Sequence, residues 1–299
     1  MNFSEITNIT IPNGVVNKIT TLEGVVLWIK KGVKPDYPIT PNLPIPNNNE
    51  IYYISTDRNK IEFSNYYSGI TPITHTYENG IGKMVFRNEL TSIGDYMFFS
   101  VDNLHSIILP KTIQYINQLS FNDCDNLETI YITDNIEFFG VSAFSTCKSL
   151  KDIYIPKNVV SLPNNFCMAC ESLTKVVIPD NIQTLGQSIF DGCYSLVDVT
   201  ISNNMWYISS RCFKDCRKLP SIVLHKRINS IRDKAFKNCY LLRSITCLRQ
   251  IAPTIEADSF ENTGIDYSGL KVLRVPEGAE GYETWLSQLK GFKIEYITE

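Results

Sequence analysis

Apolar residues recur with a period of 23 residues between residues 93 and 248, and seven such units follow one another without a shift in phase. If each unit is numbered from 1 to 23, position 12 is leucine in every unit, and positions 15 and 17 carry mainly aliphatic side chains. Position 1 is always large and apolar; its residues are Ile93, Ile116, Phe139, Leu162, Leu185, Ile208 and Ile231. A fixed period of this length predicts a solenoid, in which each unit forms one rung and packs only against its neighbours.

Two more positions of the unit are restricted in size: position 6 carries a large aromatic side chain and position 9 a small one. Position 6 is usually phenylalanine: Phe98, Phe121, Phe144, Phe190, Phe213 and Phe236. Position 9 is Val101 in the first unit and cysteine in the others: Cys124, Cys147, Cys170, Cys193, Cys216 and Cys239. The fourth unit departs, because Phe166 comes one place early and Cys167 occupies position 6. We expect the thiols to act as buried small hydrophobic groups, so that serine at Cys147 is destabilising and valine there is milder.

A rough count of free energies indicates that the rungs fold together. Each rung offers about seven apolar positions, and burial of one such side chain contributes about 1.5–3 kcal/mol. Ordering a rung of 23 residues costs about 35 kcal/mol, at about 1.5 kcal/mol per residue. A single rung is therefore unstable, and we expect stacking to bury both faces of each rung and to complete a ladder of parallel strands.

The motif that repeats in phase is A-F-x-x-C-x-x-L followed by I-x-I-P, seen as "SAFSTCKSLKDIYIPKNVVSL" in the third unit and, in part, as "KAFKNCYLLRSI" in the seventh. Over roughly residues 83–276 this pattern resembles the BspA-like (Treponema-type) leucine-rich repeat family. The resemblance implies a right-handed leucine-rich repeat solenoid that is mostly β, with a parallel sheet on its concave face. It also implies a role among bacterial surface and adhesion proteins, and it brings no catalytic residues to this sequence.

The predicted concave strands offer candidate binding residues. If positions 15 and 17 point into the core, positions 14 and 16 point to solvent. Position 16 then forms an aromatic and aliphatic stripe beside a charged position 14; the candidates are Ile108, Tyr131, Tyr154, Val177, Asp152, Lys175 and Asp198. Such a surface favours recognition of a protein or glycan ligand, and cross-strand pairs that only stabilise the sheet would give the same pattern. Trp206 and Tyr207, at positions 22 and 23, are a secondary candidate.

The segments before the repeats differ in composition. Residues 1–34 alternate apolar and polar side chains in short runs and predict a small β unit. An isolated sheet of two or three short strands is marginal, so we expect this unit to pack on another surface, either within the chain or on a partner that it anchors the chain to. Residues 35–50 carry a proline at nearly every third place, the period of polyproline II, and predict a semi-rigid linker rather than an irregular loop.

Both ends of a solenoid need caps. Residues 51–92, with a turn at Glu78-Asn79-Gly80, predict hairpins whose last strand begins the concave sheet. After residue 251 the phase is lost, a helical stripe follows near Trp285, and residues 292–297 favour a final strand. We therefore assign residues 51–92 to an N-terminal cap, 93–251 to the solenoid and 252–299 to a C-terminal cap.

Composition narrows the possible functions. The chain has 299 residues and a formal net charge of −3, which gives no electrostatic basis for binding nucleic acid. It contains no apolar run of 18 residues, so no membrane span is expected. Its first residues lack the regions of a secretory signal, so no signal peptide is visible.

The sequence offers no basis for catalysis, a cofactor or a metal. Its three histidines, His75, His105 and His225, occupy unrelated positions, and no hydrolase, nucleotide-binding or metalloprotease motif is present. Cys167 and Cys170 have the spacing of a zinc or redox half-site, but no second pair lies near them. We expect a non-enzymatic protein with reduced cysteines.

The leading hypothesis is a non-enzymatic extracellular or cell-surface binding and adhesion protein that presents its repeat surface to a protein or glycan. The main alternative is a structural or host-binding virion protein of a phage of gut bacteria, anchored through residues 1–34. The repeat family favours the cell surface, whereas the lack of a visible signal peptide favours the virion.

Overall fold

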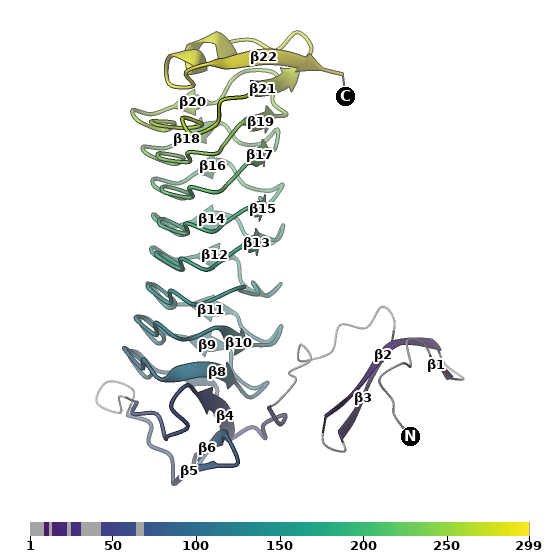
Figure 1. Cartoon of the computed structure of the whole chain (residues 1–299), viewed down its shortest axis with the longest axis vertical. Coiled ribbons are helices and arrows are strands. Elements are labelled where there is room, and N and C mark those ends of the chain that lie inside the picture. Colours follow the sequence, from purple (N-terminus) through teal and green to yellow (C-terminus); the bar gives the residue numbers. More distant parts are fainter. Residues whose placement is uncertain (1–8, 12–13, 23–24, 31–42, 64–68, 299) are drawn as a thin grey trace.

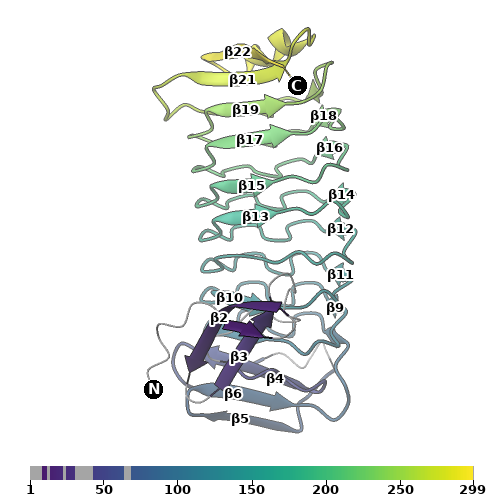
Figure 2. The same ribbon diagram turned by 90° about the vertical axis from the view of Figure 1, so that its right-hand side faces the viewer.

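The computed structural model describes residues 9–11, 14–22, 25–30, 43–63 and 69–298 of the chain. The repeats stack into one tall column with little curvature, with successive rungs lying above one another (Figures 1 and 2). The predicted parallel, mostly β solenoid is confirmed. The sheet expected on a concave face lies along a side of the column that is nearly straight in profile (Figure 1).

Two rows of parallel strands run along the column. The first row uses positions 14–17 and comprises β8 (Leu104–Ile108), β10 (Thr129–Tyr131), β13 (Lys175–Val177), β15 (Asp198–Thr200), β17 (Ser221–Leu224) and β19 (Ser244–Cys247). The second row uses positions 23 and 1 and comprises β7 (Ser92–Ile93), β9 (Tyr115–Ile116), β11 (Phe138–Phe139), β12 (Ser161–Leu162), β14 (Thr184–Leu185), β16 (Tyr207–Ile208) and β18 (Ser230–Ile231). Paired residues lie one sequence period apart, for example Thr129 with Ser106, so the strand register repeats the sequence period.

The first row is interrupted at the third rung, where residues 151–156 form no strand. A second interruption separates β15 from β17, so β13 and β15 form a two-stranded sheet of their own. Hydrogen bonds still cross the gap at the third rung, because the amide of Lys151 donates to Glu128 over 3.2 Å and the amide of Thr174 donates to Lys151 over 3.3 Å. The stack is therefore continuous although the sheet is not.

A third ladder joins the rungs through residues at positions 4 and 8 that adopt a left-handed backbone. In the third rung these are Ser142 and Thr146, with φ of 56° and 60°. The amides at positions 4, 6 and 8 donate to carbonyls of the next rung, as Phe144 does to Phe166 over 3.0 Å. Because a positive φ strains most side chains, position 8 carries Asp, Asn or Gly in several rungs: Asp123, Gly192, Asp215 and Asn238.

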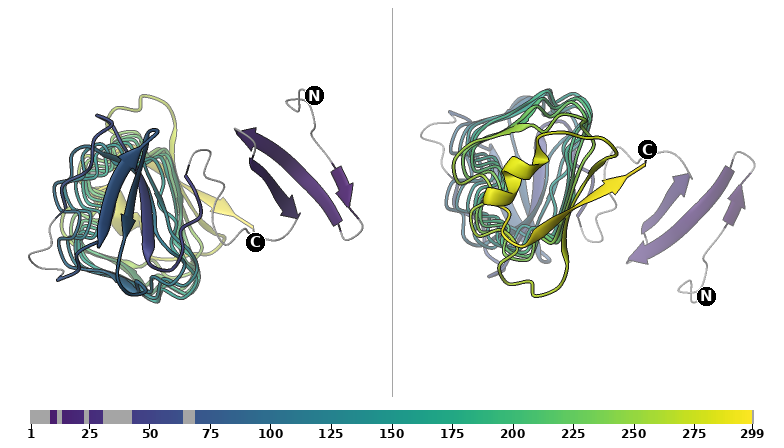
Figure 3. Two further views of the ribbon diagram at one scale, coloured as in Figure 1. Left: turned by 90° about the horizontal axis from the view of Figure 1, so that it is seen from below. Right: turned by 90° about the horizontal axis from the view of Figure 1, so that it is seen from above.

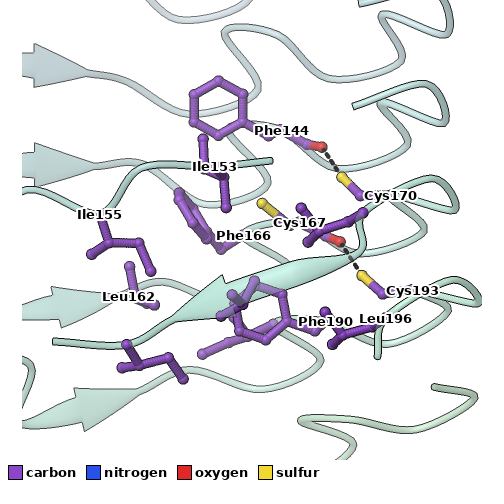
Figure 4. Packing of buried hydrophobic residues seen from close by; sticks show 14 of the residues in the cluster. Phe144, Ile153, Ile155, Leu162, Phe166, Cys167, Cys170, Phe190, Cys193 and Leu196 are labelled. Carbon is purple, nitrogen blue, oxygen red and sulfur yellow. Dashed lines mark hydrogen bonds between the residues drawn. The ribbon is translucent and has the colours of Figure 1, made fainter. Parts of the chain in front are cut away.

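Stacked phenylalanine rings form the centre of the core. Their centroids lie 5.0–5.8 Å apart in two nearly parallel runs: Phe98, Phe121 and Phe144, then Phe190, Phe213, Phe236 and Phe260. Between the runs, Phe166 meets Phe144 edge-on, with an interplanar angle of 87°. Cys167 takes the place of the missing ring, so the departure seen in the sequence is a local repacking of a continuous core (Figure 4).

The position 9 thiols are hydrogen-bond donors as well as small core groups. All nine cysteines are buried and unpaired. Each repeated thiol donates to the position 6 carbonyl of the preceding rung over 2.9–3.3 Å, as Cys170 does to Phe144 (Figure 4). At the last rung the hydroxyl of Thr263 makes the same bond to Phe236. The expectation that position 9 is purely hydrophobic is thus corrected, because the position 6 carbonyl of the preceding rung accepts a hydrogen bond from this side chain.

The N-terminal cap consists of β4 (Glu50–Ser55), β5 (Thr74–Glu78) and β6 (Ile81–Val85). β5 and β6 form the predicted hairpin, with Asn79 and Gly80 at positive φ in the turn. The strand order is β10-β8-β4-β6-β5, with β4 antiparallel to both β6 and β8. The prediction that the last cap strand begins the repeat sheet is therefore wrong, since β4 lies between β6 and the first repeat.

The cap begins earlier in the chain than residue 51. Leu43 is buried in a small cluster with Ile108. The carbonyls of Asn48 and Asn49 accept hydrogen bonds, each 2.9 Å long, from the amides of Leu90 and Phe86. The structure thus places residues 43–50, assigned to the linker above, in contact with the cap.

Residues before the cap include three strands, β1 (Ile9–Ile11), β2 (Gly14–Leu22) and β3 (Val25–Lys30), which form an antiparallel sheet in that order. This agrees with the small β unit predicted for residues 1–34. Residues 35–42 of the predicted linker lie outside the described residues.

The C-terminal cap begins with an eighth rung, in which β20 (Thr254–Ile255) extends the second row and β21 (Lys271–Pro276) the first. A 3₁₀ helix, η1 (Tyr282–Ser287), covers the end of the column, and Trp285 is fully buried against Phe260 (Figure 3). β22 (Phe292–Ile297) then pairs with β21 in parallel. The predicted helical stripe and final strand are confirmed.

A polar contact holds the interior of the N-terminal cap. The hydroxyl of the buried Tyr53 lies 2.6 Å from Nε2 of His75 and accepts a hydrogen bond from the amide of Ile61. When His75 is neutral, its Nε2 can accept this hydrogen bond from the hydroxyl of Tyr53. Burial, with a smaller effect of Lys60, lowers the pKa of His75 below its ordinary value of 6.5.

The first prediction concerns the thiol ladder. Cys147→Ser should lower the free energy of unfolding less than Cys147→Ala, by about 1 kcal/mol, because serine keeps a donor for the carbonyl of Phe121 and alanine does not. Chemical denaturation of the two variants gives this difference. Equal stabilities, or a less stable serine variant, would show that the slot selects only for apolar character.

The second prediction concerns pH. The unfolded chain protonates His75 more readily than the folded cap does, so stability is complete above the unfolded pKa of about 6.5 and falls as the pH drops below it. The thermal midpoint should therefore fall between about pH 7.5 and about pH 5.5. In His75→Gln the fall should be smaller, because glutamine offers an acceptor that does not titrate. The same fall in both proteins would contradict this role for His75.

The third prediction tests the start of the cap. Deleting residues 1–42 should leave the denaturation midpoint nearly unchanged, because few contacts are expected to cross an extended proline-rich segment. Deleting residues 1–50 should lower it, since Leu43, the Asn48 and Asn49 carbonyls and the Glu50–Lys83 ion pair of 2.8 Å are all lost. Identical midpoints for the two deletions would show that residues 43–50 do not stabilise the cap and belong to the linker.

Candidate recognition surface

The outward side of the first strand row, which we call the sheet face, presents positions 14 and 16 to solvent as predicted. Positions 15 and 17 are buried along most of its length, as with Ile153 and Ile155. At position 16, Tyr154, Val177 and Val223 are 37%, 46% and 43% exposed. Tyr154 and Val177 lie on adjacent rungs and form an exposed apolar pair, and the exposed Thr200 separates this pair from Val223.

The N-terminal end of the predicted stripe is not available to a ligand. Ile108 is fully buried and packs with Leu43, and Tyr52 and Ile54 of β4 cover the same cluster. Tyr131 is half-buried against this cluster, and the burial raises the pKa of its phenol. The assignment of Ile108 as a binding residue is therefore wrong, because β4 adds a cap surface that the repeat pattern did not indicate.

Charged residues flank the apolar pair. At position 14, Lys175 pairs with Asp198 of the next rung over 2.6 Å, and both side chains are more than half exposed. Asp152 is exposed at the neighbouring rung, where partial desolvation raises the pKa of its carboxyl. Exposed ion pairs contribute little to folding stability, so the fold does not depend on these charges.

Tyr154 is held in place by a residue that the sequence reasoning missed. Its hydroxyl donates to Asp134 at position 19 of the preceding rung, and desolvation together with this carboxylate raises the pKa of Tyr154 to about 12. Lys157 lies 3.8 Å from the same carboxylate. The two predicted tyrosines thus differ, since Tyr131 packs against the cap and Tyr154 is a positioned, partly exposed ring.

The secondary candidates lie on the second strand row rather than on the sheet face. Trp206 is 56% exposed, and the guanidinium of Arg227 lies 5.9 Å from its ring centroid. Tyr207 has Arg232 at 5.8 Å in the same arrangement. The structure therefore does not bring Trp206 and Tyr207 together with Tyr154 in one site.

The remaining chemical candidates form no site. Cys167 and Cys170 are fully buried in the core, and burial raises the pKa of the Cys167 thiol well above its ordinary value. Among the described residues, no group of three or more His, Cys, Asp or Glu side chains is placed to hold a metal ion. Within the same residues, no helix has the length and apolar character needed to cross a bilayer.

An asparagine ladder at position 20 was also missed. The side-chain amides of Asn135, Asn158 and Asn204 donate to the position 19 carbonyls of their preceding rungs, over 2.6–2.7 Å. Asn181 makes a similar bond to Val159. The repeated asparagine in the sequence was the available signal, and its effect is to fix the turn between the two strand rows.

These features define a scaffold of stacked repeats with two solvent-exposed strand rows. The family model of the BspA-type leucine-rich repeat region matches residues 70–171 and 160–271, with six copies. The chain therefore belongs to the BspA-type leucine-rich repeat family. None of the curated proteins matches it.

Solved structures show the same fold. A leucine-rich repeat protein of Treponema pallidum is 24% identical, with a TM-score of 0.52 and coverage of 65% of this chain and 86% of that chain. A leucine-rich repeat protein of Bacteroides ovatus is 23% identical, with a TM-score of 0.51 and coverage of 74% of this chain and 65% of that chain. The chain thus spans about 65% of the length of the Bacteroides protein.

Proposed function

We propose that this chain is a non-enzymatic binding protein of the bacterial cell surface that recognises a protein ligand through its sheet face. The observation that carries the proposal is the exposed apolar pair Tyr154 and Val177, with Val223 exposed two rungs beyond Val177. Interfaces are typically built from a row of aromatic and aliphatic side chains with a polar and charged surround. Folding alone does not require apolar side chains at these outward positions.

Two further features support a protein ligand. Beside the apolar residues, the charges alternate along position 14: Asp152, Lys175 and Asp198. A partner with the complementary order of charges can bind this face in only one alignment. The row of strands behind this face is also long and nearly straight in profile (Figure 1), an arrangement that suits another folded protein better than a small molecule, which needs a concave pocket.

Placement at the cell surface rests on the repeat family. BspA-type repeats are typical of surface-exposed bacterial proteins, and the repeat fold usually serves as a non-catalytic scaffold. We propose that residues 1–34 attach the protein to its partner on the surface, with residues 35–42 as the spacer. Loss of surface attachment on deletion of residues 1–42, with ligand binding retained by the remaining protein, would support this division of roles.

The fourth prediction tests the sheet face. The double variant Tyr154→Ala, Val177→Ala should weaken binding of the labelled protein to its target surface by about tenfold or more, because exposed apolar anchors usually carry interface energy. The measurement is binding to cultured epithelial and bacterial cells, with and without prior protease treatment of those cells. Protease treatment should remove the binding.

Val160→Ala is the matched control, because Val160 is equally apolar and 54% exposed but belongs to position 22. It should bind as the unmodified protein does. Unchanged binding by the double variant, or binding that survives protease treatment, would contradict the proposal. All variants should share one thermal midpoint, since the altered side chains are outside the core.

A further inference from the structure

A polar groove lies on a different side of the column from the sheet face, at the corner that leads into the second strand row. Its volume is about 310 Å³, within the lower range of ligand sites. It is lined from four successive levels by residues at positions 20 and 22, including Glu89, Thr112, Gln114, Asn135 and Glu137. With rungs about 4.8 Å apart, four levels span roughly 14 Å.

The groove offers fixed hydrogen-bond acceptors. The side-chain amides of Asn135 and Asn158 already donate to main-chain carbonyls over 2.6 and 2.7 Å, so their amide oxygens remain as acceptors. The hydroxyl of Thr112 donates to the carbonyl of Leu90 over 2.6 Å and keeps its lone pairs. The carboxylates of Glu89 and Glu137 each accept one side-chain amide hydrogen bond, from Asn48 and Gln114, and their remaining lone pairs are further acceptors. The groove is therefore preorganised for a ligand rich in hydroxyl donors.

Two exposed aromatic residues are the chain neighbours of residues that line the groove. Tyr115 and Phe138 directly follow the lining residues Gln114 and Glu137 in the chain, and they are 41% and 47% exposed. They pair in register between β9 and β11, so their side chains leave the same face on adjacent rungs. The main-chain amides of Glu137 and Phe138 both donate to Gln114, which keeps the corner in one conformation.

The equivalent aromatic residues farther along the column differ in one respect. Trp206 and Tyr207 each have a guanidinium near the ring, from Arg227 and Arg232. Near the groove, the rungs offer amide, hydroxyl and carboxylate groups instead. Of the aromatic side chains at positions 22 and 23, Tyr115 and Phe138 are thus the pair combined with an acceptor-rich groove.

We infer that this corner is a saccharide-binding site for a neutral oligosaccharide. The apolar faces of sugar rings stack on Tyr115 and Phe138, and their hydroxyls donate to the acceptors of the groove. Two carboxylates disfavour sialylated, sulfated or uronate-containing glycans by like-charge repulsion. This site is separate from the protein-binding sheet face and does not depend on it.

The fifth prediction tests this site in the full-length chain. Cellohexaose, maltohexaose, chitohexaose and mannohexaose are the probes, with saturation-transfer NMR to detect binding and calorimetry to measure affinity. At least one of the four should bind. Tyr115→Ala and Phe138→Ala should each weaken that binding by about tenfold, as expected for one lost aromatic contact. The control Trp206→Ala should leave it unchanged.

A cationic peptide is the competing occupant, since acidic and aromatic groups also attract lysine and arginine. The double variant Glu89→Gln, Glu137→Gln decides between them. Glutamine keeps an acceptor oxygen, so saccharide affinity should change less than about threefold and should be insensitive to salt. A lysine-rich peptide would instead lose most of its affinity in this variant and at high salt.

Three results would overturn the inference. They are failure of all four oligosaccharides to bind, saccharide binding that Tyr115→Ala and Phe138→Ala leave intact, and selective binding of the lysine-rich peptide. None of these results concerns the sheet face. The proposal that the sheet face binds a protein ligand is therefore tested independently. Thermal midpoints equal to that of the unmodified protein will show that each variant is folded.

Discussion

The constraint on which the structure depends is the short, constant distance between successive rungs. Strands in a hydrogen-bonded row lie about 4.8 Å apart, and the stacked rings of the core lie 5.0–5.8 Å apart. A side chain at one position therefore rests on the same position of the next rung. The interior must offer a matching shape at every level, and this explains the invariant leucine at position 12.

The thiol column follows from the same constraint. A phenylalanine at position 6 leaves its carbonyl facing the next rung, and only a small donor fits beside the next ring. Cysteine meets both requirements, and Thr263 meets them at the last rung through its hydroxyl. At the fourth rung, Phe166 and Cys167 exchange the large and small side chains between neighbouring positions. The core remains filled at this rung, although Phe166 packs edge-on against Phe144 instead of stacking parallel to it.

The repeat leaves variation to the outward positions, and this separates structure from recognition. Each strand row carries its own surface: the first presents Tyr154 and Val177 beside paired charges, and the second presents Tyr115 and Phe138 beside a polar groove. Because the rungs impose one spacing on both rows, side chains from different units align without any long loop. A repeat scaffold can therefore hold two unlike surfaces on one rigid column, and neither requires a change in the core.

The sequence by itself determined the repeat, the register and the inward positions, because a strict period of 23 residues has only one way to bury the same apolar set in every rung. It also indicated the hairpin turn at Asn79-Gly80 and the helical turn at Trp285, which depend on local chemistry. Only the tertiary structure decided that β4 lies between the cap hairpin and the repeats and buries Ile108, since that pairing joins segments distant in sequence. It likewise decided that Tyr154 is bound to Asp134 and that a groove opens beside Tyr115, because both arise from contacts between rungs.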